Sequence, residues 1–67
     1  MSNRIPRNAT HMNVEFLTET SAGAVGTKLI AEKDEQGWHG TDKNGKRFFL
    51  FTSHLRNENL CRLSSVR

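Results

Sequence analysis

Short runs of alternating hydrophobic and polar residues recur along this chain, and this pattern predicts half-buried β-strands. In "MNVEFLTE", residues 12–19, the side chains of Met12, Val14 and Phe16 fall on one side of an extended backbone. The following stretch "TSAGAVG", residues 20–26, is rich in small residues and is expected to be a loop. The first strand should therefore bury one face and expose the other.

A second strand is expected in "TKLIAEK", residues 27–33, where the alternation allows two registers. In the first register Leu29 and Ala31 face the core, and in the second Ile30 does. The pattern does not choose between them. The next residues, "DEQG", have the composition of a turn and end on a glycine that can adopt positive φ.

The dipeptide Asn44-Gly45 lies between two further strand-like runs, "WHGTD" and "KRFFLF". An Asn-Gly pair in this setting is a strong hairpin signal, because a primed two-residue turn needs positive φ at both central positions. The sequence therefore predicts two strands joined by a two-residue turn at Asn44 and Gly45.

The run "FFLF", residues 48–51, holds more bulky apolar side chains than one face of a short strand can bury. Alternation places Phe49 and Phe51 on one side, and Phe48 and Leu50 on the other. Since a small fold has one interior, we expect one pair to be at least partly exposed. Exposed bulky apolar residues mark a surface for binding or self-association.

The C-terminal part begins with "TSHLRNEN", residues 52–59, which indicates a turn or a single helical turn. A last short strand is expected in "LCRLSSV", residues 60–66. The alternative is a longer helix through residues 52–63, with three leucines on one side. Five short strands favour an all-β fold that curls into a small barrel, because closure reduces exposed edges.

The length of 67 residues allows one domain with a thin core. Cys61 is the only cysteine, so an intrachain disulfide is excluded and stability must come from packing or from a homo-oligomer. No apolar run is long enough for a transmembrane helix, and the N-terminus lacks the apolar stretch of a secretory signal. We expect a soluble cytoplasmic protein with no membrane partner.

The N-terminal stretch "MSNRIPRNATH", residues 1–11, is polar, and Ile5 is its only strong hydrophobe after Met1. It has too few apolar groups to pack on a core, so we expect a flexible, disordered tail. The folded domain is then expected to span residues 12–67.

The stretches "LIAEKDEQGW" and "NGKRFFLFTSHL" resemble an SH3-type barrel, and the likeness extends over residues 26–63. Phe51, Ser53 and Leu55 occupy positions where that family has Phe, Ser and Tyr. The resemblance implies five strands in two small orthogonal sheets, with a short helical turn at Thr52–Leu55. The chain has no Tyr, and Thr52 stands in place of the family's Pro. The peptide-binding function of the family is therefore not implied, and Trp38 alone carries over as a ligand-facing aromatic residue.

The formal net charge of +3 comes from the C-terminal half. Residues 35–67 hold six Lys and Arg against three acidic residues, whereas residues 1–34 hold four of each. The candidate basic residues are Lys43, Lys46, Arg47, Arg56 and Arg62. They form a phosphate-binding patch if the hairpin and the last strand share one side, and an ordinary solvated face otherwise.

Two aromatic residues, Trp38 and Phe49, are candidates for stacking on bases beside this basic set. Trp38 either lies on the surface for this purpose or closes one end of the thin core. Both interpretations remain open from the sequence.

Enzymatic chemistry is not indicated, because no nucleophile and base occur at a recognisable spacing and no glycine-rich phosphate loop is present. The three His and Cys61 match no closed zinc site, so neither a metal nor a cofactor is expected. We expect a regulatory binding protein whose partner is nucleic acid or an acidic protein surface. The alternative is an inhibitor or adaptor, of the kind carried by phages or mobile elements, that docks on a larger protein through the surplus Phe side chains.

Overall fold

The computed structural model describes residues 3–20, 23–41 and 44–67. Its elements follow the order β1 (His11–Phe16), β2 (Lys28–Asp34), β3 (Gly37–Thr41), β4 (Arg47–Leu50), α1 (Thr52–Arg56) and β5 (Cys61–Ser64). All strand pairs are antiparallel, and the five strands form one sheet in the order β4-β3-β2-β1-β5. The all-β class, the five strands and the helical turn predicted from the sequence are confirmed.

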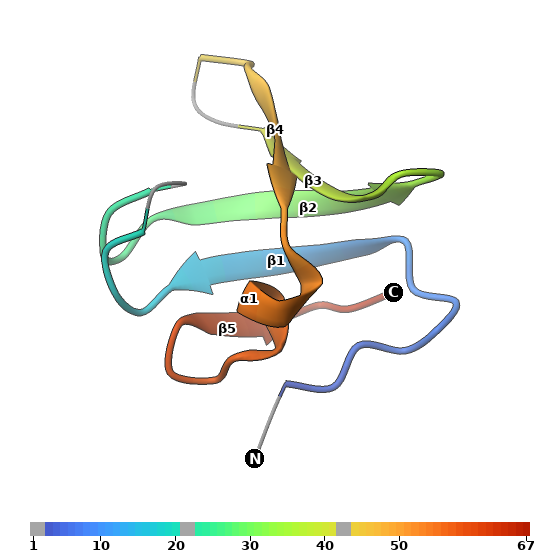
Figure 1. The fold of residues 1–67 in the computed structure, drawn as a ribbon, viewed down its shortest axis with the longest axis horizontal. Coiled ribbons are helices and arrows are strands. Elements are labelled where there is room, and N and C mark those ends of the chain that lie inside the picture. Colours follow the sequence, from blue (N-terminus) through green and yellow to red (C-terminus); the bar gives the residue numbers. More distant parts are fainter. Residues whose placement is uncertain (1–2, 21–22, 42–43) are drawn as a thin grey trace.

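The sheet folds over itself, so that its two ends share one core. Figure 1 shows that β4 runs steeply across the directions of β1 and β2. The helix α1 lies directly below β4 in this view. The buried residues are Ala9, Met12, Val14, Phe16, Ala31, Trp38, Leu50, Leu55 and Cys61. The inward face predicted for the first strand is therefore confirmed. In β2, Ala31 is fully buried while Ile30 is 56% exposed, which selects the first of the two possible registers.

The prediction of a closed barrel is wrong. The strands form one sheet rather than two, and within the described residues its edge strands, β4 and β5, do not pair with each other. Leu55 of α1 is fully buried. The side-chain amide of Asn3 donates hydrogen bonds of 2.9 Å to the carbonyl oxygens of Leu55 and Cys61. The N-terminal segment is thus bound to α1 and β5 at the open edge of the sheet.

The connection between β3 and β4 is longer than the predicted two-residue turn. Thr41 pairs with Arg47, so the connection runs over residues 42–46. Gly45 has φ of 82°, as expected for a left-handed turn position. A two-residue turn at residues 44–45 would place Thr41 opposite Phe48, so the observed pairing of Thr41 with Arg47 excludes it.

The N-terminal segment lies against the domain over its described residues. Ala9 is buried, and Ile5 is partly buried against the core. The backbone N–H groups of Thr10 and His11 donate to the carbonyl of Arg67, at 2.7 and 2.8 Å, and Figure 1 shows the segment beside the C-terminus. The expectation that this segment cannot pack is wrong for residues 3–10, while its flexibility stays a prediction.

The short helix α1 ends at Arg56, and β5 begins at Cys61. The longer helix considered through residue 63 is therefore wrong, and the last short strand is confirmed. No helix in the described ranges is long and apolar enough to span a membrane.

Candidate interaction surface

Four aromatic rings form a continuous row over β3, β4 and α1. The ring centroids of His39 and Phe49 lie 5.5 Å apart, those of Phe49 and Phe51 5.2 Å, and those of Phe51 and His54 5.3 Å. Each pair meets edge to face, which is a favourable geometry for aromatic rings. We call His39, Phe49, Phe51 and His54 the aromatic row.

The two phenylalanines of the row are open to solvent. Phe49 is 46% exposed and Phe51 is 57% exposed. Leu50 is buried and Phe48 packs partly buried against the core, so the prediction that one of the two pairs is exposed is confirmed. The exposed pair is the one that contains Phe49, a predicted site residue.

The backbone register of the β3–β4 pair positions the row. His39 lies directly opposite Phe49 across the two strands. The Phe49 ring covers Gly37, where an added Cβ would lie 3.3 Å from Phe49 Cε1. Gly37 also has φ of 125°, which a residue with a side chain rarely adopts. Because Gly37 has no side chain, the Phe49 ring can pack directly against its backbone.

A small hollow of about 50 Å³ opens beside the row. Its walls include Leu50, Leu55 and Leu60 together with the rings of Phe49 and Phe51. Ligand pockets run to hundreds of Å³, so this hollow is too small for a cofactor. Its size and apolar walls suit the tip of one aliphatic side chain.

A polar cluster borders the His39 end of the row. Asp34 Oδ2 lies 2.7 Å from an Nη of Arg47 and 3.3 Å from Nδ1 of His39. The backbone N–H of Gln36 donates a 2.8 Å hydrogen bond to Asp34 Oδ1. This hydrogen bond is the largest cause of the lowered pKa of Asp34, and the charges of His39 and Arg47 lower it further. Arg47 is thus paired with a carboxylate of the same surface.

Nδ1 of His39 is a buried atom without a hydrogen bond, although Asp34 Oδ2 is 3.3 Å away. The contact has the distance of an ion pair but not the geometry of a hydrogen bond. His39 is therefore held in the row mainly by its ring contact with Phe49 and by the strand pairing.

The described members of the predicted basic set do not gather in one patch. Arg47 is paired with Asp34, and Arg56 lies in a separate cleft at the end of α1. Lys46 is exposed at the end of the β3–β4 connection. Lys43 lies outside the described residues.

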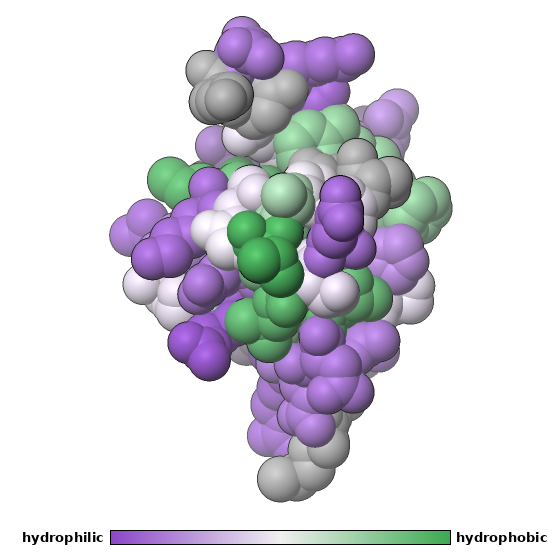
Figure 2. All heavy atoms as spheres, turned by 90° about the vertical axis from the view of Figure 1, so that its left-hand side faces the viewer, coloured by the Kyte–Doolittle hydropathy of each residue, from purple (hydrophilic) through white to green (hydrophobic). Residues whose placement is uncertain are grey.

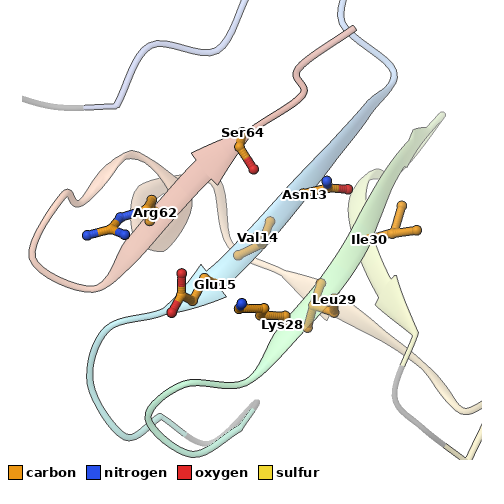
Figure 3. A pocket seen from close by; sticks show the side chains of 8 residues that line it. All are labelled: Asn13, Val14, Glu15, Lys28, Leu29, Ile30, Arg62 and Ser64. Atoms are coloured by element: carbon orange, nitrogen blue, oxygen red, sulfur yellow. The ribbon is translucent and has the colours of Figure 1, made fainter.

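Arg62 lies on the outer face of β5, opposite Glu15 of β1 in the strand register. Figure 3 shows this face, with Lys28 extending toward Glu15 and the guanidinium of Arg62 directed away from β1. The shallow hollow here has a volume of about 460 Å³ and carries both charge signs. Mixed charges on an open sheet face are typical of a solvated surface, so Arg62 has the character of an ordinary surface residue.

Trp38 belongs to the core, with only 3% of its surface exposed. The alternative in which its ring stacks on a base is therefore wrong for the folded protein. Trp38 pairs with Leu50 across β3 and β4, and both residues belong to the buried core.

A cleft of about 430 Å³ brings together Arg56 with two cations that the sequence did not single out, Arg7 and Lys33. Arg7 belongs to the segment for which the sequence predicts a flexible tail. Lys33 shares the inward side of β2 with Ala31 and pairs with Trp38. The period-two alternation of that strand, combined with the "GW" turn, was the signal that could have placed Lys33 beside Trp38.

Figure 2 shows the side of the molecule that carries the β1–β2 connection, with hydrophobic groups near its centre and hydrophilic groups above and below. Val25 of this connection is 64% exposed. Single exposed aliphatic residues are ordinary on protein surfaces, whereas contiguous apolar groups mark interaction sites. The aromatic row is therefore the stronger candidate surface.

No three His, Cys, Asp or Glu side chains gather into a possible metal site among residues 3–20, 23–41 and 44–67. Cys61 is a buried free cysteine, and burial raises the pKa of its thiol. A raised pKa keeps the thiol protonated, so Cys61 behaves as a small apolar core residue.

The chain was compared with protein-family models, curated proteins and solved structures, and none of them matches it. The function is therefore inferred from the geometry of the surface itself.

Proposed function

We propose that this protein is a small, non-enzymatic binding protein that docks on a larger protein through the aromatic row. The exposed pair of Phe49 and Phe51 carries the proposal, because these are bulky apolar side chains at 46% and 57% exposure on a 67-residue chain. Aromatic anchors that fill or frame a small apolar pocket supply most of the energy of many protein interfaces.

The occupant of this surface is an extended protein segment with an aliphatic side chain. Two features support this choice. The hollow beside Phe49 and Phe51 has room for one aliphatic side-chain tip. The neighbouring strand β4 is an edge of the sheet, and an edge strand can accept another strand through its backbone groups. The Asp34–Arg47 pair then forms part of a polar rim.

A nucleic acid fits the row less well, because carboxylates lie close to it. Asp34 contacts His39 and Arg47, and Glu32 lies opposite His39 in the strand register. Phosphates held near stacked bases would therefore meet negative charge, which opposes their binding.

Nucleic-acid binding is kept as a second candidate on one observation: Lys46 is exposed beside the strand that carries Phe49. If phosphates contact Lys46, the Lys46→Ala variant should lower the slope of log affinity against log salt concentration by roughly 0.7–0.9. Phe49→Ala should weaken binding to a single-stranded oligonucleotide by about 1–3 kcal/mol if the ring stacks on a base. No binding by the folded wild type at low salt, ~50 mM, removes this candidate.

We also propose that the fold is an open relative of the SH3-like arrangement implied by the resemblance. In support, β1 to β4 follow one another as neighbours in the sheet, and α1 lies directly before the last strand. The absence of Tyr in this chain keeps the proposed partner distinct from the proline-rich ligands of that family.

Affinity capture from a lysate of the producing cells, with and without nuclease, tests the docking proposal. Wild-type protein should retain a protein partner after nuclease treatment, and the double variant Phe49→Ser, Phe51→Ser should lose it. Ile30→Ser is the matched control, because Ile30 is 56% exposed on the outer face of β2. Retention of the same partner by the double variant, after circular dichroism has shown it to be folded, would contradict the proposal.

A further inference from the structure

The cleft at the end of α1 has an unusual charge composition. Arg7 of the N-terminal segment, Lys33 of β2 and Arg56 of α1 all line it, so three cations from three parts of the chain converge on one space. No acidic residue lines the cleft in the described part of the chain. The cleft therefore concentrates positive charge more strongly than the net charge of +3 would suggest.

Among the described residues, these three cations lack a carboxylate partner of the kind that Arg47 has. Arg47 is paired with Asp34 at 2.7 Å, whereas none of the three cleft cations forms an ion pair with a described carboxylate. The ammonium of Lys33 donates instead to the backbone carbonyl of Arg7, at 3.4 Å. Like charges held close together repel, and an anion in the cleft would relieve this repulsion.

The walls of the cleft are suited to more than a bare ion. Ile5 and Pro6 supply apolar surface, Trp38 borders the cleft with the small part of its surface that is exposed, and Thr52 supplies a hydroxyl. The volume of about 430 Å³ is within the range of small-molecule sites. Guanidinium groups match the geometry of phosphate oxygens and bind them by paired hydrogen bonds.

We propose that this cleft binds a terminal phosphate monoester that carries an organic group. Arg7, Lys33 and Arg56 contact the phosphate, and the apolar wall contacts the organic part. Three cations suit the double negative charge of a monoester better than the single charge of a carboxylate. The proposed site uses none of the aromatic row and goes beyond the docking function.

The fluorescence of Trp38 provides a direct measurement, because Trp38 is the only tryptophan and lines the cleft. Ribose 5-phosphate should change this fluorescence in a saturable way, whereas ribose should not. In a second arm, an oligonucleotide with a 5′-phosphate is compared with the same strand ending in a 5′-hydroxyl. A phosphate-dependent fluorescence change in the first arm supports a free sugar phosphate as the ligand. A phosphate-dependent change in the second arm alone supports the phosphorylated end of a strand. The absence of such a change in both arms overturns the proposal.

Matched variants separate a built site from diffuse attraction. Arg7→Gln and Arg56→Gln should each weaken phosphate binding about tenfold or more, because each removes a charged hydrogen-bond donor. Arg62→Gln removes the same charge from the outer face of β5 and should leave binding unchanged. Lys33→Arg keeps the charge and should retain binding, even if a neutral variant fails to fold. Equal losses of phosphate affinity in the Arg62→Gln and Arg56→Gln variants would overturn the proposal.

Discussion

The side-chain amide of Asn3 donates a 2.9 Å hydrogen bond to the backbone carbonyl of Cys61, 58 residues further along the chain. The same amide donates to the carbonyl of Leu55 at 2.9 Å, and the backbone N–H of Asn3 donates to the carbonyl of Arg56 at 2.7 Å. One residue near the N-terminus therefore joins α1 to β5, where the sheet stays open.

The Asn3→Ala variant should lower the free energy of unfolding by about 1–3 kcal/mol, because the two carbonyl oxygens lose their donor in a partly buried place. Urea denaturation measures this change. Asn8→Ala is the matched control, since Asn8 is exposed in the same segment, and it should have little effect. Equal effects of the two variants would show that the Asn3 contacts do not hold the segment.

Gly45 should tolerate substitution only by residues that accept positive φ. Its φ is 82°, and an added Cβ would meet nothing within 4 Å, so any cost comes from the backbone rather than from a clash. Gly45→Val should destabilise by more than about 1 kcal/mol, and Gly45→Asn by clearly less, because Asn enters this region more readily. Thermal unfolding of both variants checks the prediction, and an unchanged melting temperature for Gly45→Val would contradict it.

Asp34 should make stability depend on acid pH. Its pKa is lowered from the ordinary value of 3.8, chiefly by the hydrogen bond from the Gln36 N–H and also by His39 and Arg47. A lowered folded-state pKa contributes stability above the ordinary value, and this contribution is lost as the pH falls through the lowered value.

The test is denaturation of wild type and Asp34→Asn across this pH range. The variant should be less stable near neutral pH, and the difference should shrink as wild-type Asp34 becomes protonated. Glu35→Gln, which removes a carboxylate from the same turn, controls for general charge effects. A difference between wild type and Asp34→Asn that is independent of pH would show that the ionised carboxylate is not responsible.

The first two strands were predictable from local alternation, as in Met12, Val14 and Phe16, which are all buried. The next two were predictable from the Asn44-Gly45 pair between two strand-like runs. The open barrel was not predictable, because the contacts of Asn3 connect residues 52 and 58 positions apart. No local pattern indicates that a polar residue in a polar segment will bind the backbone of α1 and β5.

The aromatic row was predictable only in part. The exposure of Phe49 follows from the surplus of apolar residues in its strand, but its contact with His39 follows from the register. A two-residue turn at residues 44–45 would have placed residue 39 opposite residue 50, whereas the longer loop places His39 opposite Phe49. A shift of one residue exchanges the two faces of a strand, so the predicted turn could not reveal the row.

Trp38 and Phe49 should respond in opposite ways to truncation, although both are aromatic residues of the β3–β4 hairpin. Trp38 is 3% exposed, whereas Phe49 is 46% exposed. Removing a buried aromatic side chain leaves a cavity and costs about 3–5 kcal/mol, which is a large share of the stability of so small a domain. Trp38→Ala should therefore be largely unfolded by circular dichroism, while Phe49→Ala should keep the wild-type spectrum.

Circular dichroism and the capture experiment on these two variants together distinguish a role in packing from a role in binding. Phe49→Ala should remain folded yet bind the proposed protein partner more weakly, since the ring is an anchor rather than a core residue. Trp38→Phe, which keeps most of the buried volume, should restore folding and retain the partner, because Trp38 does not belong to the docking surface. If Trp38→Phe is folded but loses the partner, the partner instead binds on the cleft side of the molecule. If Phe49→Ala unfolds, the aromatic row is part of the core.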